Sequence, residues 1–536
     1  MDGHHQVSNH NTSSTTVSRH YQSYNQSHNQ SHNESHNESH NESHNESQND
    51  NTHANNSEST PLLPSFLRVD TLQVHHEGES GRSGFHPRHF LNVLYTSSSR
   101  VSSLVNFLWP AVPAAIIIRY VAPHLQSWIF ALSYIGMVPA ANLLGFAGQE
   151  FARKVPSKVA GILIETTFGS IVEIILFVVL IVKHENTTDE GDNADEGNLI
   201  PIIQAAILGS ILTNLLLCLG LCFYFGGLRV QTEKFHSVVS EVGSGLLLVA
   251  GFGLLIPSAF YSALKGETVR EVKNGLWIWK EKFTQDRLQD DILRISQITS
   301  IVLIIAFGCY LWYNARSQHS IFDEIIEMDE HRDADREEDM ARMRFTSTET
   351  LIALVLSLTF ATWLLILLVE QIEHVVKSGV PDQFLGLILL PLVEKAAEHL
   401  TAIDEAYDGV INVALYHCLG PSIQTALFNG PLVVLVGWAL GKPMDLNFEI
   451  FMIVLLVLSV LVVGNFLRDG ESNWLEGALL VIVYVIIAIA SWYYPNPDVA
   501  TSNGIETLLP SGTSNQTIAV DAELLKQLLA QLHLQQ

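Results

Sequence analysis

The chain has 536 residues, of which 47% are hydrophobic and only 16% are charged, and its mean hydropathy is +0.22. Such values over this length exclude an ordinary soluble protein and favour a polytopic membrane protein. The formal net charge is −26, but the acidic residues gather in the N-terminal tail and in hydrophilic loops. Because no basic patch is present, the chain is not expected to bind nucleic acid.

The first segment, residues 1–90, is polar and is predicted to be a disordered tail. It repeats Ser-His-Asn-Gln/Glu, which places a histidine at every fourth residue from His28 to His44. Such a tract can act as a weak metal or pH sensor. The serine and asparagine content disfavours a helix and favours instead a repeat without a site. The start of the chain lacks the apolar core of a signal peptide, so the first hydrophobic helix is expected to direct membrane insertion.

About eleven hydrophobic windows follow, each close to the length that crosses a bilayer. They predict an all-α polytopic membrane protein, with a first half at residues 100–262 and a second half at residues 349–495. Residues 263–348 contain the sixth span and its flanking hydrophilic loops, and residues 496–536 form a C-terminal tail. The windows are residues 103–118, 126–147, 159–183, 199–226, 237–262, 293–314, 349–370, 383–404, 409–440, 446–467 and 474–494.

A strongly acidic segment, residues 323–339, follows the sixth window. Clusters of carboxylates can bind Ca²⁺ weakly, but this segment lacks the Asp-x-Asp-x-Asp-Gly pattern of an EF-hand. A solvated acidic helix or linker is the favoured alternative.

The charges of the loops predict which helix ends face the cytosol. The loop 153–158 is basic, as are Arg229 and Lys234 in a later loop, whereas residues 185–196 between them are acidic. The basic loops are therefore expected in the cytosol, and the number of spans places the N-terminus there too. Residues 265–291 do not follow this rule, because they contain several lysines and yet fall on the side opposite the cytosol.

Two stretches place ionisable side chains inside otherwise apolar segments, one in each half of the chain. Charged groups at bilayer depth are energetically costly, so they predict a cavity or an ion pathway. A structural alternative is that the lysine pairs with a neighbouring acid, or that the charges reach the interface from a helix end. The residues concerned are Glu165, Ser170 and Glu173 in the first half and Glu394, Lys395, Glu398 and His399 in the second.

In each half, a second helix with a Gly-Ser or Gly-Pro-Ser element follows the acidic helix. Glycine and proline loosen a membrane helix, and duplicated units with broken helices and polar midplane groups are typical of secondary transporters. Carboxylate, amide and hydroxyl oxygens suit Ca²⁺, and a buried carboxylate can carry a proton when no cation is bound. Bundles held together by polar contacts are the alternative. Candidate ligands or supports on the second helices are Gln204, Ser210 and Asn214 in the first half and Ser422 and Gln424 in the second.

The four cysteines lie within apolar segments and follow no zinc-binding spacing. Cys218 and Cys222 are interpreted as small residues that pack between helices. The other two cysteines are Cys309 and Cys418.

Several runs of residues resemble the vacuolar Ca²⁺/H⁺ exchangers of the cation/Ca²⁺ exchanger superfamily. The resemblance covers roughly residues 139–495, and its most specific run is Asp-Gly-Glu-Ser-Asn-Trp-Leu-Glu-Gly at residues 469–477. The other runs are Leu-Leu-Gly-Phe-Ala at 143–147, Leu-Gly-Ser-Ile-Leu-Thr-Asn-Leu-Leu-Leu at 208–217, Phe-Gly-Gly-Leu-Arg at 225–229 and Gly-Leu-Ile-Leu-Leu-Pro at 386–391.

The resemblance implies the cation/Ca²⁺ exchanger fold, with eleven spans and two inverted repeats, in the vacuolar membrane. It implies that the protein exchanges Ca²⁺, or another divalent cation such as Mn²⁺, for protons, with no cofactor and no enzymatic activity. Glu173 and Glu398 are then the transport carboxylates that share one metal site.

Both repeat motifs depart from the family pattern. The first repeat has Ser170 where the family has an asparagine, and Glu165 stands where another asparagine is usual. In the second repeat, Glu394 and Lys395 replace the family's Gly-Asn pair, which is expected to remove a hinge and a neutral oxygen ligand. Lys395 brings a tethered cation that can block or tune the site. Counting four glutamates against this lysine leaves three net negative charges, which still suits a divalent ion.

The predicted function is therefore a secondary transporter that exchanges Ca²⁺ or a similar divalent cation for H⁺. The alternative is a divergent, transport-inactive relative that serves as a membrane regulator or partner, which Lys395 and Pro421 motivate. An enzyme is the weakest alternative, because no nucleophile set, phosphate loop or zinc motif is apparent.

Overall fold

The computed structural model describes residues 84–96, 100–155, 158–184, 199–265, 268–273, 276–281, 285–316, 333 and 344–494. Eight helices among these residues are long and apolar enough to cross a membrane, and Ile450–Phe466 is a shorter apolar helix. Three predicted features lie largely or wholly outside the described residues, namely the histidine repeats, the acidic loop 323–339 apart from Asp333, and the C-terminal tail.

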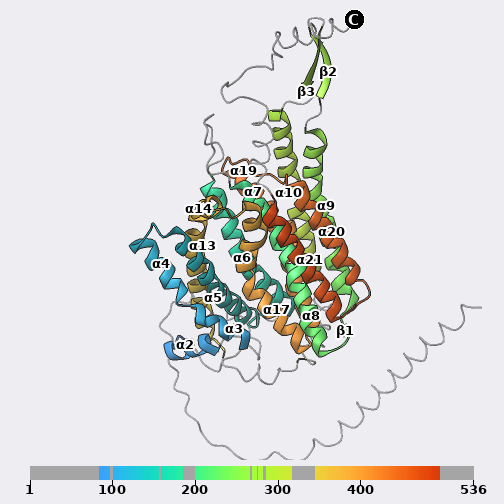
Figure 1. Ribbon diagram of the computed structural model, residues 1–536. Coiled ribbons are helices and arrows are strands. Elements are labelled where there is room, and N and C mark those ends of the chain that lie inside the picture. The colour runs from blue at the N-terminus through green and yellow to red at the C-terminus, as the bar shows by residue number, and fades with distance from the viewer. Residues whose placement is uncertain are drawn as a thin grey trace, which may run out of the picture. The chain divides into compact units, whose positions relative to one another are not determined.

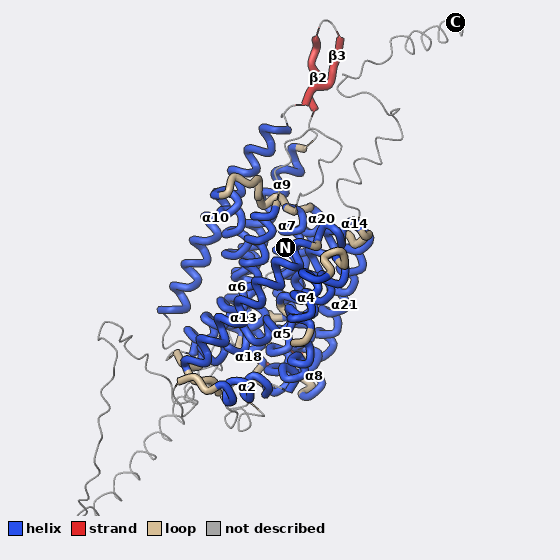
Figure 2. Tube along the Cα trace, turned by 90° about the vertical axis from the view of Figure 1, so that its left-hand side faces the viewer, coloured by secondary structure: helices blue, strands red, loops and turns tan. Residues whose placement is uncertain are grey.

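Each of the eleven predicted windows falls on helix, and the helices run side by side (Figures 1 and 2). The elements of the first half are α2 (Pro87–Thr96), α3 (Arg100–Val105), η3 (Asn106–Leu108), α4 (Ala111–Val121), α5 (Gln126–Ala152), α6 (Lys158–Lys183), α7 (Ile200–Leu212), η4 (Thr213–Cys218), α8 (Leu219–Arg229), β1 (Glu233–Lys234) and α9 (Ser237–Leu264).

The sixth window lies on α10 (Gln285–Arg316), which follows the antiparallel hairpin β2 (Thr268–Lys273) and β3 (Leu276–Glu281). The elements of the second half are α13 (Ser347–Glu370), α14 (Ile372–Lys377), α15 (Asp382–Phe384), η5 (Leu385–Leu389), α16 (Leu390–Glu394), α17 (Ala396–Asp408), α18 (Ile411–Gln424), η6 (Thr425–Asn429), α19 (Gly430–Ala439), α20 (Ile450–Phe466), β4 (Glu471–Ser472) and α21 (Trp474–Tyr493). The short strands add to the predicted all-α fold without changing its class.

The two halves contain matching helix pairs. In the first half, α6 is followed by the continuous rod α7–η4–α8, and in the second half the segment α15–α17 is followed by α18–η6–α19. The π-helical segments η4 and η6 begin three residues after Ser210 and Ser422, respectively. π-helical turns widen a helix locally and occur often at functional sites. The predicted breaks at glycine and proline are therefore wrong in detail, because α7 runs through Gly209 and α18 runs through Pro421.

Gly209 and Gly386 allow α7 and η5 to cross in close contact. A Cβ atom at Gly209 would lie 2.2 Å from the carbonyl oxygen of Leu387, and one at Gly386 would lie 2.8 Å from the carbonyl oxygen of Ile202. Real Cβ atoms do not come so near to a backbone oxygen. Gly209 therefore serves close packing rather than the loosening of its helix.

We expect Gly209→Ala to destabilise the protein by about 1–3 kcal/mol or more, because the rigid backbone of η5 must shift. A fitting control is Gly245→Ala in α9, where no atom of the described residues lies within 4 Å of the added Cβ atom. That substitution should stabilise the helix by about 0.5–1 kcal/mol. Thermal unfolding of the detergent-purified variants measures both effects, and equal midpoints would contradict the close crossing.

The segment that resembles exchangers most specifically, residues 469–477, has a structural role. Its strand β4 pairs with β1, which follows the first repeat, and Asn473 caps α21 by accepting hydrogen bonds from the amides of Leu475 and Glu476. Gly477 packs against α8, because its Cβ would lie 2.3 Å from the Tyr224 amide nitrogen. The motif therefore joins α21 to the end of the first repeat.

Glu233 in β1 is a buried acid, and one of its carboxylate oxygens has no hydrogen-bond partner in the part of the chain that the structure describes. Burial raises the pKa of this carboxyl from 4.5 to about 8. The folded state therefore holds the proton more tightly than the unfolded chain. Stability from this group is fully present below about pH 4.5 and falls as the pH rises to about 8.

We expect Glu233→Gln to remove this fall, so that the variant unfolds at a higher temperature than the wild type near pH 8 but at a similar one near pH 5. The partly exposed Glu471 of the paired strand β4 offers a matched control for the loss of one carboxylate, with Glu471→Gln as the variant. Thermal unfolding across this pH range is the measurement. An unchanged pH profile in Glu233→Gln would contradict the expectation.

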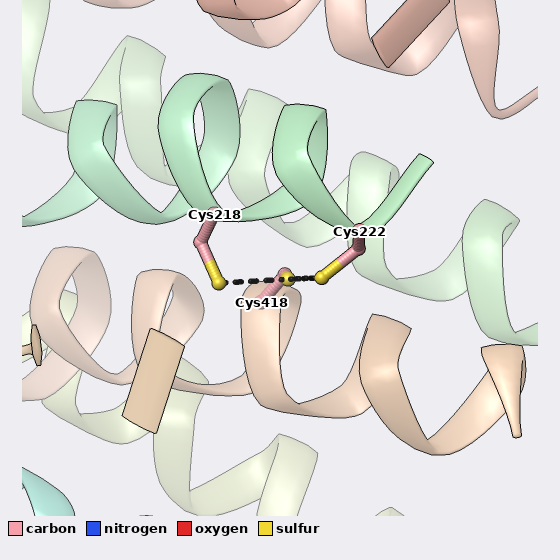
Figure 3. Close-up of side chains that lie close together, drawn as sticks. All are labelled: Cys218, Cys222 and Cys418. Atoms are coloured by element: carbon pink, nitrogen blue, oxygen red, sulfur yellow. Dashed lines mark hydrogen bonds between the residues drawn. The ribbon is translucent and has the colours of Figure 1, made fainter. Parts of the chain in front are cut away.

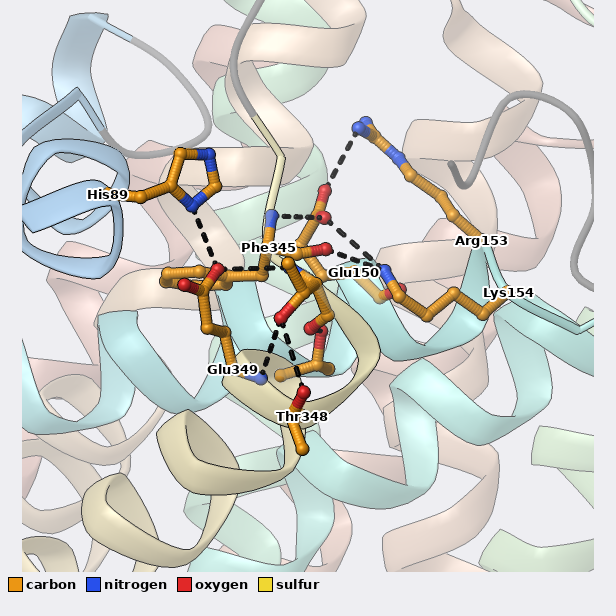
Figure 4. A network of polar contacts seen from close by, with 9 residues as sticks. His89, Glu150, Arg153, Lys154, Phe345, Thr348 and Glu349 are labelled. Atoms are coloured by element: carbon orange, nitrogen blue, oxygen red, sulfur yellow. Dashed lines mark hydrogen bonds and ion pairs between the residues drawn. The ribbon is translucent and has the colours of Figure 1, made fainter. Parts of the chain in front are cut away.

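A buried polar network joins α2, α5 and α13 (Figure 4). Glu349 of α13 accepts hydrogen bonds from the amides of His86 and Thr346 and lies 2.9 Å from Nδ1 of His89. Glu150 of α5 accepts from the amide of Phe345. The predicted disordered tail thus ends earlier than residue 90, because α2 begins at Pro87 and buries His89 and Phe90.

Candidate functional site

Glu173 lies at the centre of the polar groups that the two repeats bring together. It sits in α6 with no exposed surface, and its carboxylate accepts hydrogen bonds from the Thr425 hydroxyl at 2.8 and 2.9 Å and from Nδ2 of Asn429 at 3.0 Å. Both donors belong to the π-helical segment η6 of the other repeat. The first-half carboxylate is therefore held by second-half side chains.

Lys395 lies between the two predicted transport carboxylates. Its Nζ atom is 3.4 Å from Oε2 of Glu173 and 3.5 Å from Oε2 of Glu398, and its side chain is fully buried. The alternative was that the lysine pairs with the adjacent Glu394. The structure shows instead that Lys395 pairs with Glu173 of the other repeat and with Glu398. The ammonium group compensates two carboxylates whose helices are more than 200 residues apart in sequence.

A helix interruption positions this lysine. Helix α16 ends at Glu394 and α17 begins at Ala396, so that Lys395 occupies the junction with φ −95° and ψ 0°. The expectation that the loss of the family's glycine removes the hinge is thus wrong, since a lysine adopts the bridge conformation there. In the first repeat α6 is continuous across the corresponding stretch.

Glu398 forms the exposed edge of the site. Its side chain is 21% exposed and packs on Gly169 of α6, where a Cβ atom would lie 2.0 Å from Oε1. A pocket leads to it, lined by residues that include Gln149, Thr401 and His417. Gln149 lies in the last turn of α5, so the pocket lies toward the end of the bundle that carries Arg153. Glu398 is therefore the carboxylate that an ion from this end would meet first.

Several other predicted residues present buried polar atoms without a hydrogen-bond partner among the described residues. These atoms are the hydroxyls of Ser170 and Ser210, Oε1 of Glu394 and Nδ2 of Asn214. The amide oxygen of Asn214 lies 2.9 Å from Nε2 of the buried His399. Unpaired buried polar atoms are rare in folded proteins and call for an explanation such as an ion or water.

Gln204 and Ser422 bond to groups other than the two transport carboxylates. Gln204 donates to Asp445 Oδ1 at 2.8 Å, in the loop before α20, and Ser422 donates to the carbonyl of Cys418 within its own helix. Gln424 is the last residue of α18 and is buried. Glu165 lies in α6, but its side chain is outside the described residues.

Thr425 and Asn429 are the functional candidates that sequence reasoning missed. They are spaced four residues apart, which places both on one face of a helical segment, and they are polar residues within an apolar run. Two polar residues four positions apart, directly after Gln424, are the sequence signal that could have identified them. Their partner could not be inferred, because Glu173 lies about 250 residues earlier in the chain.

The donor set fits a hard cation in its chemistry, but a lysine ammonium already lies among the donors. Carboxylates from Glu173, Glu394 and Glu398, together with hydroxyl and amide oxygens, are the ligands that Ca²⁺ prefers. Oδ1 of Asn429 is buried, has no hydrogen-bond partner within the described part of the chain, and is a further neutral oxygen. A divalent ion that binds both Glu173 and Glu398 would have to replace the ammonium of Lys395 between them.

The helices and motifs described above match the sodium/calcium exchanger protein family, whose pattern covers residues 125–316 and 349–493. This exceeds half of the chain. The chain belongs to the sodium/calcium exchanger family. The polytopic helical fold and the transporter class are thereby confirmed, and the resemblance to vacuolar exchangers is confirmed by relatives of that name.

Curated relatives include vacuolar cation/proton exchanger 2 of Oryza sativa subsp. japonica, which is 32% identical over 400 residues that cover 74% of this chain and 82% of the relative. The vacuolar calcium ion transporter of Schizosaccharomyces pombe is 29% identical over 408 residues, 76% of this chain and 89% of the relative. The Ca²⁺/H⁺ antiporter of Aphanothece halophytica is 32% identical over 374 residues, 68% of this chain and 90% of the relative.

Solved structures agree in fold. The structure of native YfkE superposes with a TM-score of 0.54 at 24% identity and covers 72% of this chain and 100% of that chain. That of the H⁺/Ca²⁺ exchanger CAX has a TM-score of 0.50 at 11% identity and covers 74% of this chain and 90% of that chain. At these identities the likeness concerns the fold alone, and the chemistry of the site is argued from its own residues.

Proposed function

We propose that this integral membrane protein exchanges Ca²⁺, or another divalent cation such as Mn²⁺, for protons across the vacuolar membrane. The observation that carries the proposal is the pair Glu173 and Glu398, which the two repeats bring to one buried ammonium group. Relatives named as vacuolar exchangers and as a Ca²⁺/H⁺ antiporter support the choice of ion and membrane.

The proposed mechanism is competition at these two carboxylates. A cation that enters the pocket meets Glu398, displaces Lys395 and reaches Glu173, where Thr425 and Asn429 orient the carboxylate. When protons bind the carboxylates instead, the cation loses its charged ligands and leaves. Because either the cation or the protons occupy the carboxylates, movement between the two membrane faces exchanges one for the other.

The pocket and the loop charges support a direction for transport. The pocket that leads to Glu398 lies toward the end of the bundle with Arg153 and Lys154, and basic loops face the cytosol in most membrane proteins. We therefore place this end and the N-terminal helix α2 in the cytosol. Cations then enter from the cytosol as protons leave the vacuole.

Transport by the purified chain in sealed vesicles tests the proposal. An imposed pH gradient should drive ⁴⁵Ca²⁺ uptake, and a protonophore should collapse it. Mn²⁺ uptake in parallel tests for a different divalent substrate. No uptake of either ion would overturn the proposal.

Lys395 favours a second candidate function, a transport-inactive membrane regulator. Its ammonium group already pairs with both carboxylates, in the place that a cation would take. A chain of this kind would gain uptake when Lys395→Asn and Glu394→Gly restore the family pattern. Uptake by the unchanged protein would exclude it.

A further inference from the structure

Three buried cysteines meet where the two repeats pack against each other (Figure 3). Cys218 belongs to η4, Cys222 to α8 and Cys418 to α18, and none of the three has exposed surface. The sulfur of Cys418 lies 3.5 Å from that of Cys218 and 3.9 Å from that of Cys222. The interpretation of Cys218 and Cys222 as packing residues did not include this third thiol.

We propose that Cys218, Cys222 and Cys418 form a buried binding site for one thiophilic divalent metal ion of the zinc and cadmium class. The three sulfurs lie within 4.8 Å of one another. With two separations of 3.5 and 3.9 Å and a third of at most 4.8 Å, a point equidistant from the three sulfurs lies at most about 2.4 Å from each, close to the zinc–thiolate bond length of about 2.3 Å. An ion can therefore bind all three sulfurs without a large movement of the helices.

The donor set determines the class of ion. Thiolates are soft ligands that bind zinc and related metals, whereas Ca²⁺ requires oxygen ligands. Each sulfur that coordinates as a thiolate releases its proton to solvent, and the electron pair of the former S–H bond forms the sulfur–metal bond. Metal affinity therefore rises with pH.

The cation pocket lies close to this site. His417 and Pro421 of α18 line the pocket that leads to Glu398, and Cys418 belongs to the same turn of that helix. Cys218 lies one helical turn after Asn214, which contacts His399 beside the carboxylates. A soft metal ion that enters the pocket thus comes close to the thiols, and once bound it links helices of both repeats.

Cadmium binding to the reduced, purified full-length protein tests the proposal. We expect one Cd²⁺ per chain with the ultraviolet absorption of cadmium–thiolate bonds, and this signal should strengthen as the pH rises. Cys418→Ser should lower the affinity at least about tenfold, the effect expected even for residues that only support a metal ligand. The control is Cys309→Ser in α10, because Cys309 is exposed and outside the cluster.

Two further variants keep the test independent of folding and of cation exchange. Cys222→Ala should lose the thiolate absorption as Cys418→Ser does, with the unfolding temperature of each variant confirming that it is folded. Glu173→Gln should retain this absorption, and excess Ca²⁺ should not displace the Cd²⁺. Equal absorption in Cys418→Ser and the wild type, or loss of Cd²⁺ on addition of Ca²⁺, would overturn the proposal.

Discussion

Glu173→Gln and Glu398→Gln should each lower pH-gradient-driven ⁴⁵Ca²⁺ uptake at least about tenfold. That factor is the loss expected when a residue only supports a metal ligand, and the loss of a carboxylate that binds the cation directly should be larger. A glutamine retains the shape of the side chain and one oxygen, but it can neither carry the exchanged proton nor supply a negative charge. Both variants therefore lose the competition between cation and proton. Uptake at the wild-type rate in either one would remove these carboxylates from the mechanism.

The two variants should differ in stability. Glu173 is fully buried, whereas the side chain of Glu398 is 21% exposed. The Glu173 carboxylate accepts hydrogen bonds from Thr425 and Asn429, and the amide nitrogen of a glutamine cannot accept; a buried donor left without its acceptor costs about 1–3 kcal/mol. We therefore expect the lower unfolding temperature in Glu173→Gln. Glu471→Gln, an acid outside the membrane helices, controls for the loss of one carboxylate.

Lys395→Asn should increase the apparent affinity for Ca²⁺ at least about tenfold. A tenfold change requires the binding free energy of Ca²⁺ to become more favourable by only about 1.4 kcal/mol. The ammonium group lies 3.4 Å from Glu173 and 3.5 Å from Glu398, so an entering cation must replace it. Without the lysine, the buried carboxylates repel one another until a cation or protons bind. The variant should therefore be less stable than the wild type when Ca²⁺ is absent.

Thermal unfolding with increasing Ca²⁺ measures this effect without relying on transport. A ligand that binds only the folded state raises the unfolding temperature in proportion to its affinity and concentration. We expect a larger rise in Lys395→Asn than in the wild type. Lys395→Arg keeps the positive charge and should respond to Ca²⁺ no more than the wild type. A smaller rise in Lys395→Asn than in the wild type would show that the lysine supports cation binding rather than competing with it.

Much of the fold follows from local properties of the sequence. A hydrophobic run of the right length becomes a membrane helix wherever it lies in the chain, so the predicted windows coincide with the helices. The run at residues 469–477 identified the family, and the ionisable residues in apolar surroundings pointed to Glu173, Lys395 and Glu398. These inferences needed no knowledge of which helices become neighbours.

Some helix details could not be read from local patterns. Gly209 and Pro421 suggested broken helices, yet α7 and α18 run through them. Lys395 suggested a lost hinge, yet the interruption remains at this residue. Glycine and proline are compatible with both a break and a close helix crossing, and only the neighbouring backbone decides between them.

The sequence by itself determined the membrane class, the positions of the helices and the residue types available for cation exchange. Only the tertiary structure decided that Lys395 lies between Glu173 and Glu398 and that Thr425 and Asn429 hold Glu173. It also brought Cys418 to Cys218, 200 residues earlier in the chain. The physical reason is that hydrophobicity and helix periodicity act within a segment, whereas contacts between the repeats depend on how distant helices pack.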